Sequence, residues 1–310
     1  MRKKVLIIGG TRFLGREIAE LFLAHGYEVS TMTRGVLSAS KGSIERILCD
    51  KNKREEFRKA LLAKEWDVII DTILNAEDLQ FVVETVGNNI GHFIHTGSVG
   101  VYGDAVRIPA EETIPRGEYS GEDILFHHKL QQDQVLMHAF HTQNFPATSL
   151  RMSNIYGAGD IPLDGWGGRA KEFFKMVYEE KEIWMAEDGR ALLHPGHVKD
   201  LARSFLCAAE NSISLGEIYN IAGSYALMLK DYVALIAEAM GKKPSYFFTS
   251  QEEVLSRYAG YTSARGLKFV SQHMCASIAK AGRDLSWRPV ISLELGMRDN
   301  IEWMQKEKMI

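Results

Sequence analysis

A glycine-rich stretch near the N-terminus suits the binding of a phosphate group. It consists of Gly9, Gly10, Thr11, Arg12, Phe13, Leu14 and Gly15, and it follows the short apolar run 5–8. Glycines at a strand-to-helix turn let the backbone approach a pyrophosphate, whose charge lies against the free N–H groups and positive dipole of the helix N-terminus. We therefore predict a dinucleotide-binding turn here. The alternative is a plain tight turn between a strand and a helix.

The end of the predicted second strand indicates which dinucleotide is bound. Proteins of doubly wound type that bind NAD usually place a carboxylate there, which accepts hydrogen bonds from the ribose hydroxyls. This sequence has Thr33 and Arg34 instead, and Arg12 is a second cation nearby. Guanidinium groups suit bidentate contacts with a 2′-phosphate, so we predict NADP as cofactor, with NAD as the alternative. The other interpretation is that Arg34 is a solvated loop residue and that Arg12 caps the turn.

The first hundred residues alternate short β-branched runs with amphipathic stretches of helical length. This pattern predicts an α/β fold with a doubly wound parallel sheet, in which ligands bind at the carboxyl ends of the strands. Two such ends supply further candidate cofactor ligands, Asp50 and Thr72. The expected strands are Val5–Gly9, Tyr27–Thr33, Arg46–Asp50, Trp66–Thr72 and His92–Ser98, and the expected helices are Leu14–His25, Lys53–Lys64 and Ala76–Gly87.

The order of motifs resembles the extended branch of the short-chain dehydrogenase/reductase superfamily, which contains nucleotide-sugar epimerases and dehydratases. Gly9, Arg12 and Gly15 fall on the three glycine positions of its turn, with Arg12 in place of the middle one. The form of the turn is also similar to that of atypical members, some of them described as RNA-binding proteins of chloroplasts. Further segments that resemble the family are 95–103, 150–157, 197–202, 219–223 and 285–303.

The resemblance implies a catalytic set that is incomplete in this chain. The family uses a Ser or Thr after the fifth strand, and a Tyr and a Lys four residues apart on the next helix. Ser98 and Lys129 fall on the Ser and Lys positions, but Leu125 stands on the Tyr position. A leucine side chain cannot transfer a proton, so either another group does so or the hydride chemistry has been lost.

Several nearby side chains are candidates to replace the missing acid. His128 is the first of them, because an imidazole titrates near neutral pH and this residue lies one turn beyond Leu125. Its alternative is a partly exposed helix residue without a catalytic part. Lys129 is also a candidate ligand of the nicotinamide ribose, and Asp50 resembles the family's adenine-binding aspartate or is a turn or N-cap residue. The other flanking candidates are Tyr102, Tyr119, Glu122, Asp123 and His127.

The remainder of the chain is expected to form a smaller substrate lobe. We predict a dinucleotide-binding domain from 1–156 with 197–223, and a substrate-binding lobe from 157–196 with 224–310. Nucleotide-sugar enzymes of the family carry a diphosphate-binding Arg at the position that is Leu193 here, and neither Arg169 nor Arg190 holds that place. We therefore expect a small polar substrate, with a nucleotide sugar as one candidate. A glycine-rich loop with Asp160, Asp164 and Trp166 either shapes a polar pocket or is an ordinary mobile loop.

Composition limits the partners and the compartment. The 310 residues are 45% hydrophobic, with 37 Lys and Arg against 40 Asp and Glu. The resulting charge of −3 argues against nucleic acid as a partner. No stretch of about 18 apolar residues predicts a membrane span. The three cysteines lack the spacing of a disulfide framework or a metal site, so we expect no metal and a cytoplasmic setting.

Two functional hypotheses follow. The first is an NADP-dependent oxidoreductase, epimerase or dehydratase that acts on a small polar substrate with a non-standard acid. The second is a catalytically silent protein that binds NAD(P) or RNA. The predicted helices 76–87 and 124–141 resemble those that pair subunits in the superfamily, so we also expect a homodimer.

Overall fold

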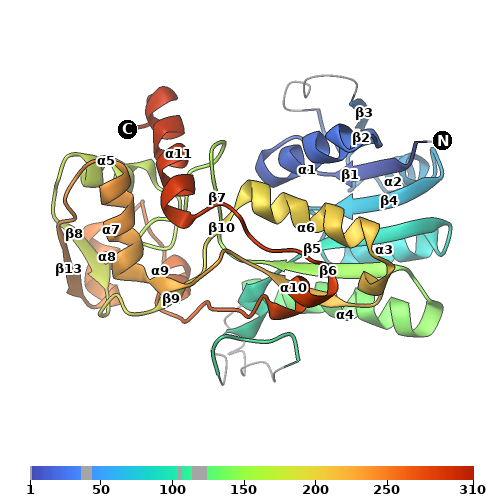
Figure 1. Ribbon diagram of the computed structural model, residues 1–310. Helices are drawn as coiled ribbons and strands as arrows, with labels where there is room; N and C mark the ends of the chain where they lie inside the picture. The colour runs from blue at the N-terminus through green and yellow to red at the C-terminus, as the bar shows by residue number, and fades with distance from the viewer. Residues whose placement is uncertain (1, 36–43, 104–106, 114–123) are drawn as a thin grey trace.

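The computed structural model describes residues 2–35, 44–103, 107–113 and 124–310, with only the backbone at 124–126 (Figure 1). Seven parallel strands form one sheet in the order β11-β6-β5-β4-β1-β2-β3. This is the order of a doubly wound sheet, with its topological switch point between β1 and β4. The strands are β1 Lys4–Ile8, β2 Glu28–Thr33, β3 Glu45–Leu48, β4 Trp66–Asp71, β5 Ile90–Ser98, β6 Ala147–Met152 and β11 Ile218–Ile221.

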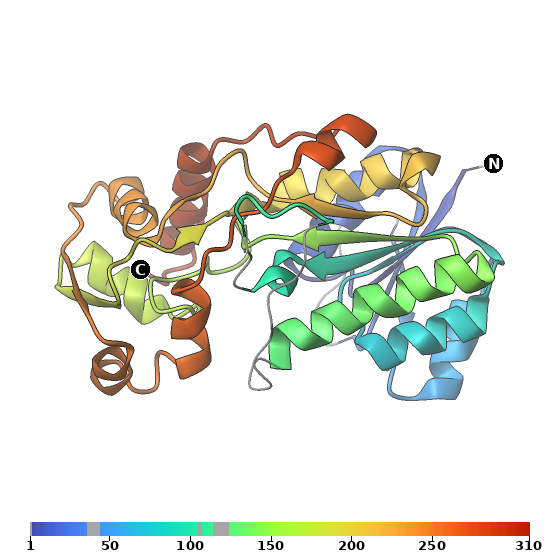
Figure 2. The same cartoon turned by 90° about the horizontal axis from the view of Figure 1, so that it is seen from below.

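Helices cover both faces of the sheet, as Figure 2 shows edge-on. The helices α1 and α6 lie on one face and α2, α3 and α4 on the other, while α10 lies beside β11. Apolar residues from both sides of the strands fill two cores, one under each helical layer. The bounds are α1 Phe13–Ala24, α2 Arg54–Leu61, α3 Ala76–Val86, α4 Ile124–Gln143, α6 Val198–Glu210 and α10 Ala279–Asp284, with the 3-10 turns η1 Val99–Tyr102 and η2 Ser212–Ser214.

The strands and helices predicted for the first hundred residues are all present. Their ends differ by up to three residues, and α2 is shorter than expected because it ends at Leu61. The predicted fold class, an α/β fold with a doubly wound parallel sheet, is confirmed by the strand order. This arrangement brings the ends of β1, β2, β4, β5 and β6 to one edge, where most of the predicted site residues lie.

A second lobe, at the left of Figure 1, has its own apolar core. We use this name for α5 Lys171–Tyr178, β8 Ile183–Ala186, β9 Leu192–Leu193, β12 Leu227–Met228, α7 Leu229–Ala239, β13 Tyr246–Thr249, α8 Gln251–Arg257, α9 Ala264–Val270 and α11 Leu293–Lys306. The short strands β7 Ile155–Tyr156 and β10 Gly196–His197 pair with each other between the sheet and this lobe. The exact residue limits of the two predicted domains stay a prediction.

The glycine-rich loop at 157–170 does not form a polar pocket at Asp164. This side chain is buried, and its carboxylate accepts hydrogen bonds from the main-chain N–H groups of Trp166, Gly168 and Ala170 at 2.8 to 2.9 Å. The Trp166 ring is also buried, stacked on Tyr258. The interpretation as a polar pocket was wrong at these two residues, because Asp164 closes the turn that inserts Trp166 into the core.

Candidate functional site

The glycine-rich turn is closely packed at the switch point of the sheet. Gly9 has a φ of +93°, which favours glycine, and its N–H donates to Met32 at 3.0 Å. A Cβ on Gly15 would overlap the carbonyl oxygen of Gly9, so α1 starts directly against this turn. Thr72 ties the end of β4 to β1, because its hydroxyl donates to the carbonyl of Ile8 at 3.1 Å.

The N-terminus of α1 is open to an anion. Arg12 is the N-cap residue, but its side chain makes no capping hydrogen bond, and the first turn of the helix contains no acidic residue. Phe13 has a φ of +35°, a backbone conformation that an L-residue rarely adopts. The first N–H groups of a helix have no partner within the helix, and here no side chain at the cap replaces one. A pyrophosphate fits this end of α1, where Arg12 is exposed and free to approach it.

The end of β2 presents an exposed cation. Arg34 is exposed directly after the strand, and the hydroxyl of Thr33 accepts a hydrogen bond from Gly35 N–H at 2.9 Å. Asp50 lies two residues after the end of β3, and its carboxylate accepts from Asn52 N–H at 3.0 Å. That contact matches the turn interpretation of Asp50.

Ser98 and Lys129 both have a hydrogen bond to the backbone near the end of β5. The Lys129 Nζ donates to the main-chain carbonyl of Thr96 at 3.2 Å, two residues before Ser98. The Ser98 hydroxyl accepts from Gly100 N–H at 3.1 Å, and both side chains are partly exposed. Burial lowers the pKa of the Lys129 amine below its usual range, although the negative charges of Asp71 and Asp133 act in the opposite direction.

The candidate replacements for the missing tyrosine are not all near this pair. His127 and His128 have exposed side chains on α4, and His127 is bonded to Gln131 at 3.1 Å. His128 was the candidate acid from the sequence. Its exposed position on α4 matches the alternative interpretation, a partly exposed helix residue. Tyr119, Glu122 and Asp123, and the side chain of Leu125, lie outside the described residues.

Tyr102 belongs to a buried polar network rather than to the open edge. Its hydroxyl donates to Asn220 Oδ1 at 2.8 Å and accepts from Arg151 Nη1 at 2.7 Å. Arg151 is 0% exposed, and its Nε donates to the carboxylate of Asp133 on α4 at 2.8 Å. Gly97 leaves room for this ion pair, since a Cβ there would lie 3.3 Å from atoms of both side chains. The network holds η1, and with it the turn after Ser98, against β6 and β11.

Two polar side chains at the end of β6 were not predicted as site residues. The Ser153 hydroxyl and the Asn154 Nδ2 are buried and have no hydrogen-bond partner among the described residues. Buried polar atoms usually have a partner, so these two are candidates to bind a ligand at the carboxyl edge. Their only signal in the sequence is their position within the family-like segment 150–157.

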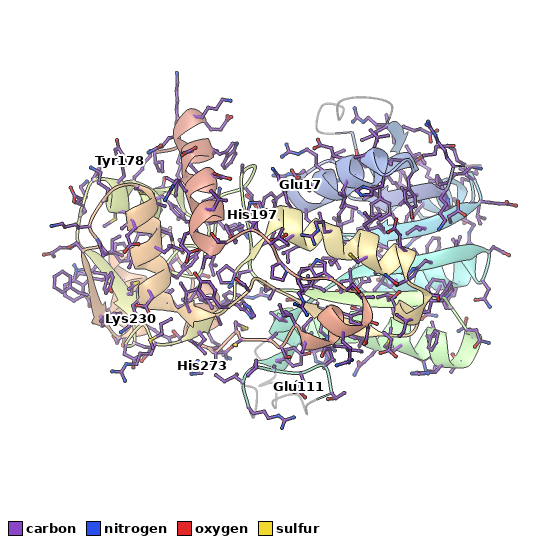
Figure 3. All side chains as sticks on the ribbon, viewed as in Figure 1. Glu17, Glu111, Tyr178, His197, Lys230 and His273 are labelled. Atoms are coloured by element: carbon purple, nitrogen blue, oxygen red, sulfur yellow. The ribbon has the colours of Figure 1, made fainter. Side chains whose placement is uncertain are left out.

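The cations considered in the second lobe are engaged or remote. Arg169 donates to the carbonyl of Ile155 at 3.1 Å and lies 3.4 Å from the carboxylate of Asp160. Arg190 is exposed beside Asp188. The Leu193 side chain is buried in the core of the lobe. Figure 3 shows His197, at the start of α6, between the sheet and the second lobe; its ring packs against Tyr156, with centroids 5.3 Å apart.

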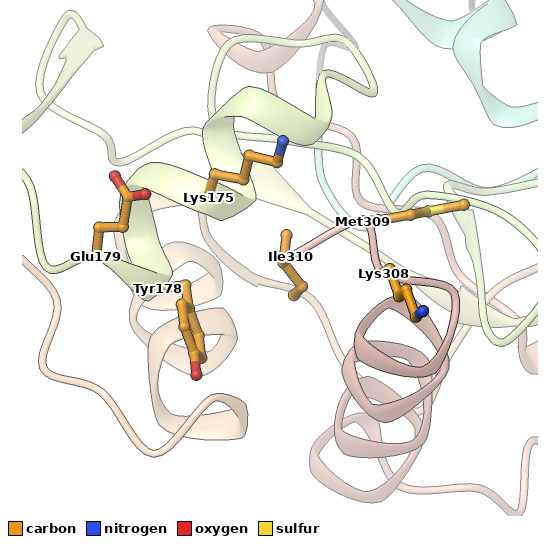
Figure 4. A pocket seen from close by; sticks show the side chains of 6 residues that line it. All are labelled: Lys175, Tyr178, Glu179, Lys308, Met309 and Ile310. Carbon is orange, nitrogen blue, oxygen red and sulfur yellow. The ribbon is translucent and has the colours of Figure 1, made fainter.

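A shallow hollow of about 280 Å³ lies between the end of α5 and the residues after α11 (Figure 4). None of the site residues predicted from the sequence lines it; its lining is Lys175, Tyr178, Glu179, Lys308, Met309 and Ile310. Within the described ranges, no group of three or more His, Cys, Asp or Glu side chains is arranged to hold a metal ion. Of the helices that the structure describes, none has the length and apolar character required to cross a bilayer.

Comparison with known proteins agrees with this geometry. Residues 5–80 and 75–222 match the profile of the NAD dependent epimerase/dehydratase family. The chain is 27% identical to the chloroplast stem-loop binding protein of 41 kDa b from Arabidopsis thaliana, over 96% of this chain and 78% of that protein. It is 23% identical to a decarboxylating sterol-4-alpha-carboxylate 3-dehydrogenase from Schizosaccharomyces pombe, over 90% of this chain and 85% of that one.

Solved structures share the fold at low sequence identity. UDP-glucose 4-epimerase from Thermotoga maritima superposes with a TM-score of 0.79 at 18% identity, over 98% of this chain and 99% of that one. UDP-glucuronic acid 4-epimerase from Bacillus cereus, solved with UDP-glucuronic acid and NAD, gives a TM-score of 0.77 at 18% identity with the same coverage. The resemblance drawn from the sequence motifs is thus confirmed, and with it the predicted function at the level of the family. The chain belongs to the NAD dependent epimerase/dehydratase family.

Proposed function

We propose that this protein is an NADP(H)-dependent oxidoreductase that acts on a small polar substrate at Ser98 and Lys129. The observation that carries the proposal is the coincidence of two features at one edge of the sheet. These are the uncapped N-terminus of α1, placed against Gly9, and the Lys129 amine held at the end of β5. The first suits a pyrophosphate, and the second suits a ribose hydroxyl or a substrate oxygen.

The residues present fit the dinucleotide. The turn from Gly9 to Gly15 would hold its pyrophosphate, Thr72 would border it, and Asp50 would face its adenine. Arg34, with Thr33 and Arg12, would contact a 2′-phosphate, which is why we favour NADP over NAD. When bound, the cofactor supplies or accepts a hydride.

The substrate would lie at the carboxyl end of β5 and β6. The Ser98 hydroxyl would orient the substrate oxygen, and Asn154 Nδ2 would donate a hydrogen bond to a substrate acceptor. The relatives named as nucleotide-sugar epimerases and as a sterol-carboxylate dehydrogenase act on small molecules, which supports a small-molecule substrate here. The position of Leu193 and the contacts of Arg169 favour a substrate other than a nucleotide sugar. A homodimer through α3 and α4 also stays a proposal.

Identification of the bound ligand tests this proposal most directly. The purified protein would be denatured and the released small molecules identified by mass spectrometry, followed by fluorescence titration of the native protein with NADPH and NADH. We expect NADP(H) in the released fraction and tighter binding of NADPH. Failure to bind either dinucleotide at millimolar concentration would overturn the proposal.

RNA binding is the second candidate, favoured by the similarity to a stem-loop binding protein over 96% of this chain. The net charge of −3 argues against a broad contact with phosphates. A filter-binding assay with a stem-loop RNA at about 0.1 M salt separates the two functions. Submicromolar RNA binding without dinucleotide binding would favour the second candidate.

A further inference from the structure

His95 is a buried histidine with an oxygen acceptor opposite each ring nitrogen. Its Nδ1 lies 2.6 Å from Asp71 Oδ2, and its Nε2 lies 3.1 Å from Gln132 Oε1. The histidine is 1% exposed and the aspartate 0%. The three residues come from β5, β4 and α4, so the contact joins neighbouring strands to the helix that carries Lys129.

The orientation of the Gln132 amide is determined by a second contact. Its Nε2 donates to the main-chain carbonyl of Leu74 at 2.9 Å. A reversed amide would place two carbonyl oxygens against each other, so the amide oxygen faces His95 and requires a proton on the histidine Nε2.

The other ring nitrogen faces a carboxylate whose second oxygen is already hydrogen-bonded. The second oxygen of Asp71, Oδ1, accepts from the N–H groups of Ile73 and Leu74 at 2.8 and 2.7 Å. Hydrogen bonds of this kind favour the carboxylate over the acid. With acceptors on both sides, a ring with a proton on each nitrogen, the imidazolium form, donates to both contacts.

This pair lies beside Lys129. Lys129 Nζ donates to the carbonyl of Thr96, the residue after His95, and the Thr96 hydroxyl donates to the carbonyl of Asp71 at 2.7 Å. Among the described residues, the charges that act on the amine are those of Asp71 on β4 and Asp133 on α4. Arg151 on β6 already balances Asp133 at 2.8 Å. The described side chain that is hydrogen-bonded to the Asp71 carboxylate is His95.

We propose that His95 is a positioning residue which, as a buried imidazolium between Asp71 and Gln132, neutralises Asp71 and leaves the Lys129 ammonium free to give its proton to the substrate oxygen. The inference rests on the proposed function. In carbonyl reduction the substrate carbon takes a hydride from the reduced dinucleotide, and the substrate oxygen takes the proton from Nζ. The products are an alcohol, the oxidised dinucleotide and a neutral amine, which water reprotonates. Lys129 thereby supplies the proton that Leu125 cannot.

The test compares His95→Gln with Asp71→Asn, two variants that must shift the titration of Lys129 in opposite directions. The protein would be labelled with ¹³C-lysine, the Lys129 signal assigned from Lys129→Arg, and its titration followed by NMR. His95→Gln leaves Asp71 unbalanced, so the Lys129 titration should move up by about one pH unit. Asp71→Asn removes the negative charge and should move it down by a similar amount. His92→Gln is the matched control, since His92 is a buried histidine on the same strand and is bonded to Thr148. This variant should leave the Lys129 titration unchanged.

The ring of His95 provides a measurement that needs no variant of the pair. Its ¹⁵N signals in the wild-type protein should show the imidazolium pattern at pH 7. A neutral ring at pH 7, or a shift of Lys129 in the same direction in both variants, would overturn the inference. Failure of the wild-type protein to bind NADPH would instead overturn the proposed function, because neither NMR measurement requires the cofactor.

Discussion

Gly15 packs directly against the main-chain carbonyl of Gly9, so any side chain at position 15 overlaps the backbone of the first turn. Gly15→Val should therefore displace α1 from the turn and weaken NADPH binding by at least about tenfold. Overpacking of this kind costs about 1–3 kcal/mol of folding free energy, so the variant should stay folded. Fluorescence titration and urea unfolding measure both quantities.

Gly282→Ala is the control for Gly15, because its Cβ would lie 3.6 Å from the nearest neighbouring atom, an ordinary contact. It should retain wild-type affinity. A soluble Gly15→Val protein with normal affinity would show that the dinucleotide binds elsewhere.

Arg34 is exposed at the end of β2, where the 2′-phosphate of NADP is expected. Arg34→Ala should lose about 1–3 kcal/mol of NADP binding, the range of a charge-assisted contact, and little NAD binding. Calorimetric titration with both cofactors checks this. Arg190→Ala, at an equally exposed arginine of the second lobe, should change neither affinity. Tighter binding of NAD than of NADP by the wild type would contradict the prediction.

Position 125 lies in α4 one helical turn before Lys129. Leu125→Tyr should place a phenol beside the Lys129 amine and raise the rate of cofactor oxidation, because it restores the family's proton-transfer pair. The assay uses a panel of sugars and small carbonyl compounds, with Ser98→Ala as the inactive control and His128→Ala as a neutral one. Wild-type turnover that is unchanged in Ser98→Ala would place the chemistry elsewhere.

Buried His92 should make stability depend on pH. Burial lowers the pKa of its ring from 6.5 to about 4. Between about pH 4 and pH 6.5, the His92 ring is protonated in the unfolded chain but neutral in the folded protein. The free energy of unfolding should therefore fall over this window, by about 3 kcal/mol from this group. Urea unfolding should show that His92→Gln removes this loss and that His138→Gln, at an exposed histidine, does not. Equal pH dependence in wild type and His92→Gln would refute it.

The buried pair of Arg151 and Asp133 should couple strongly in a double-mutant cycle. Arg151→Met leaves the aspartate charge uncompensated and the Tyr102 hydroxyl without its donor, at a cost of about 3–5 kcal/mol. Adding Asp133→Asn removes the buried charge, so the double variant should be more stable than Arg151→Met alone. Urea unfolding of the four proteins measures the coupling, and strictly additive costs would contradict it.

The sheet was predictable from the sequence because periodicity is a local signal. The β1 turn, the alternation of strands and helices, and the positions of Ser98 and Lys129 all follow from short segments. The buried polar contacts were not predictable in this way. His95 is 24 positions from Asp71 and 37 from Gln132, and only the packed fold shows that they meet. Likewise, nothing in the sequence shows that Arg151 and Tyr102 share a network, since a charged residue is usually exposed.

The last strand of the sheet has a consequence for biosynthesis. β11 pairs with β6, yet it begins 218 − 152 = 66 positions after β6 ends. On the ribosome, β6 therefore stands as an open edge while the intervening residues are synthesised. An open edge is a template for pairing with other chains. The nascent protein thus passes through a stage at which the unpaired backbone groups of β6, the strand that carries Arg151, lie beside the strand that carries Ser98. A translational pause at this stage would expose them to pairing with other chains.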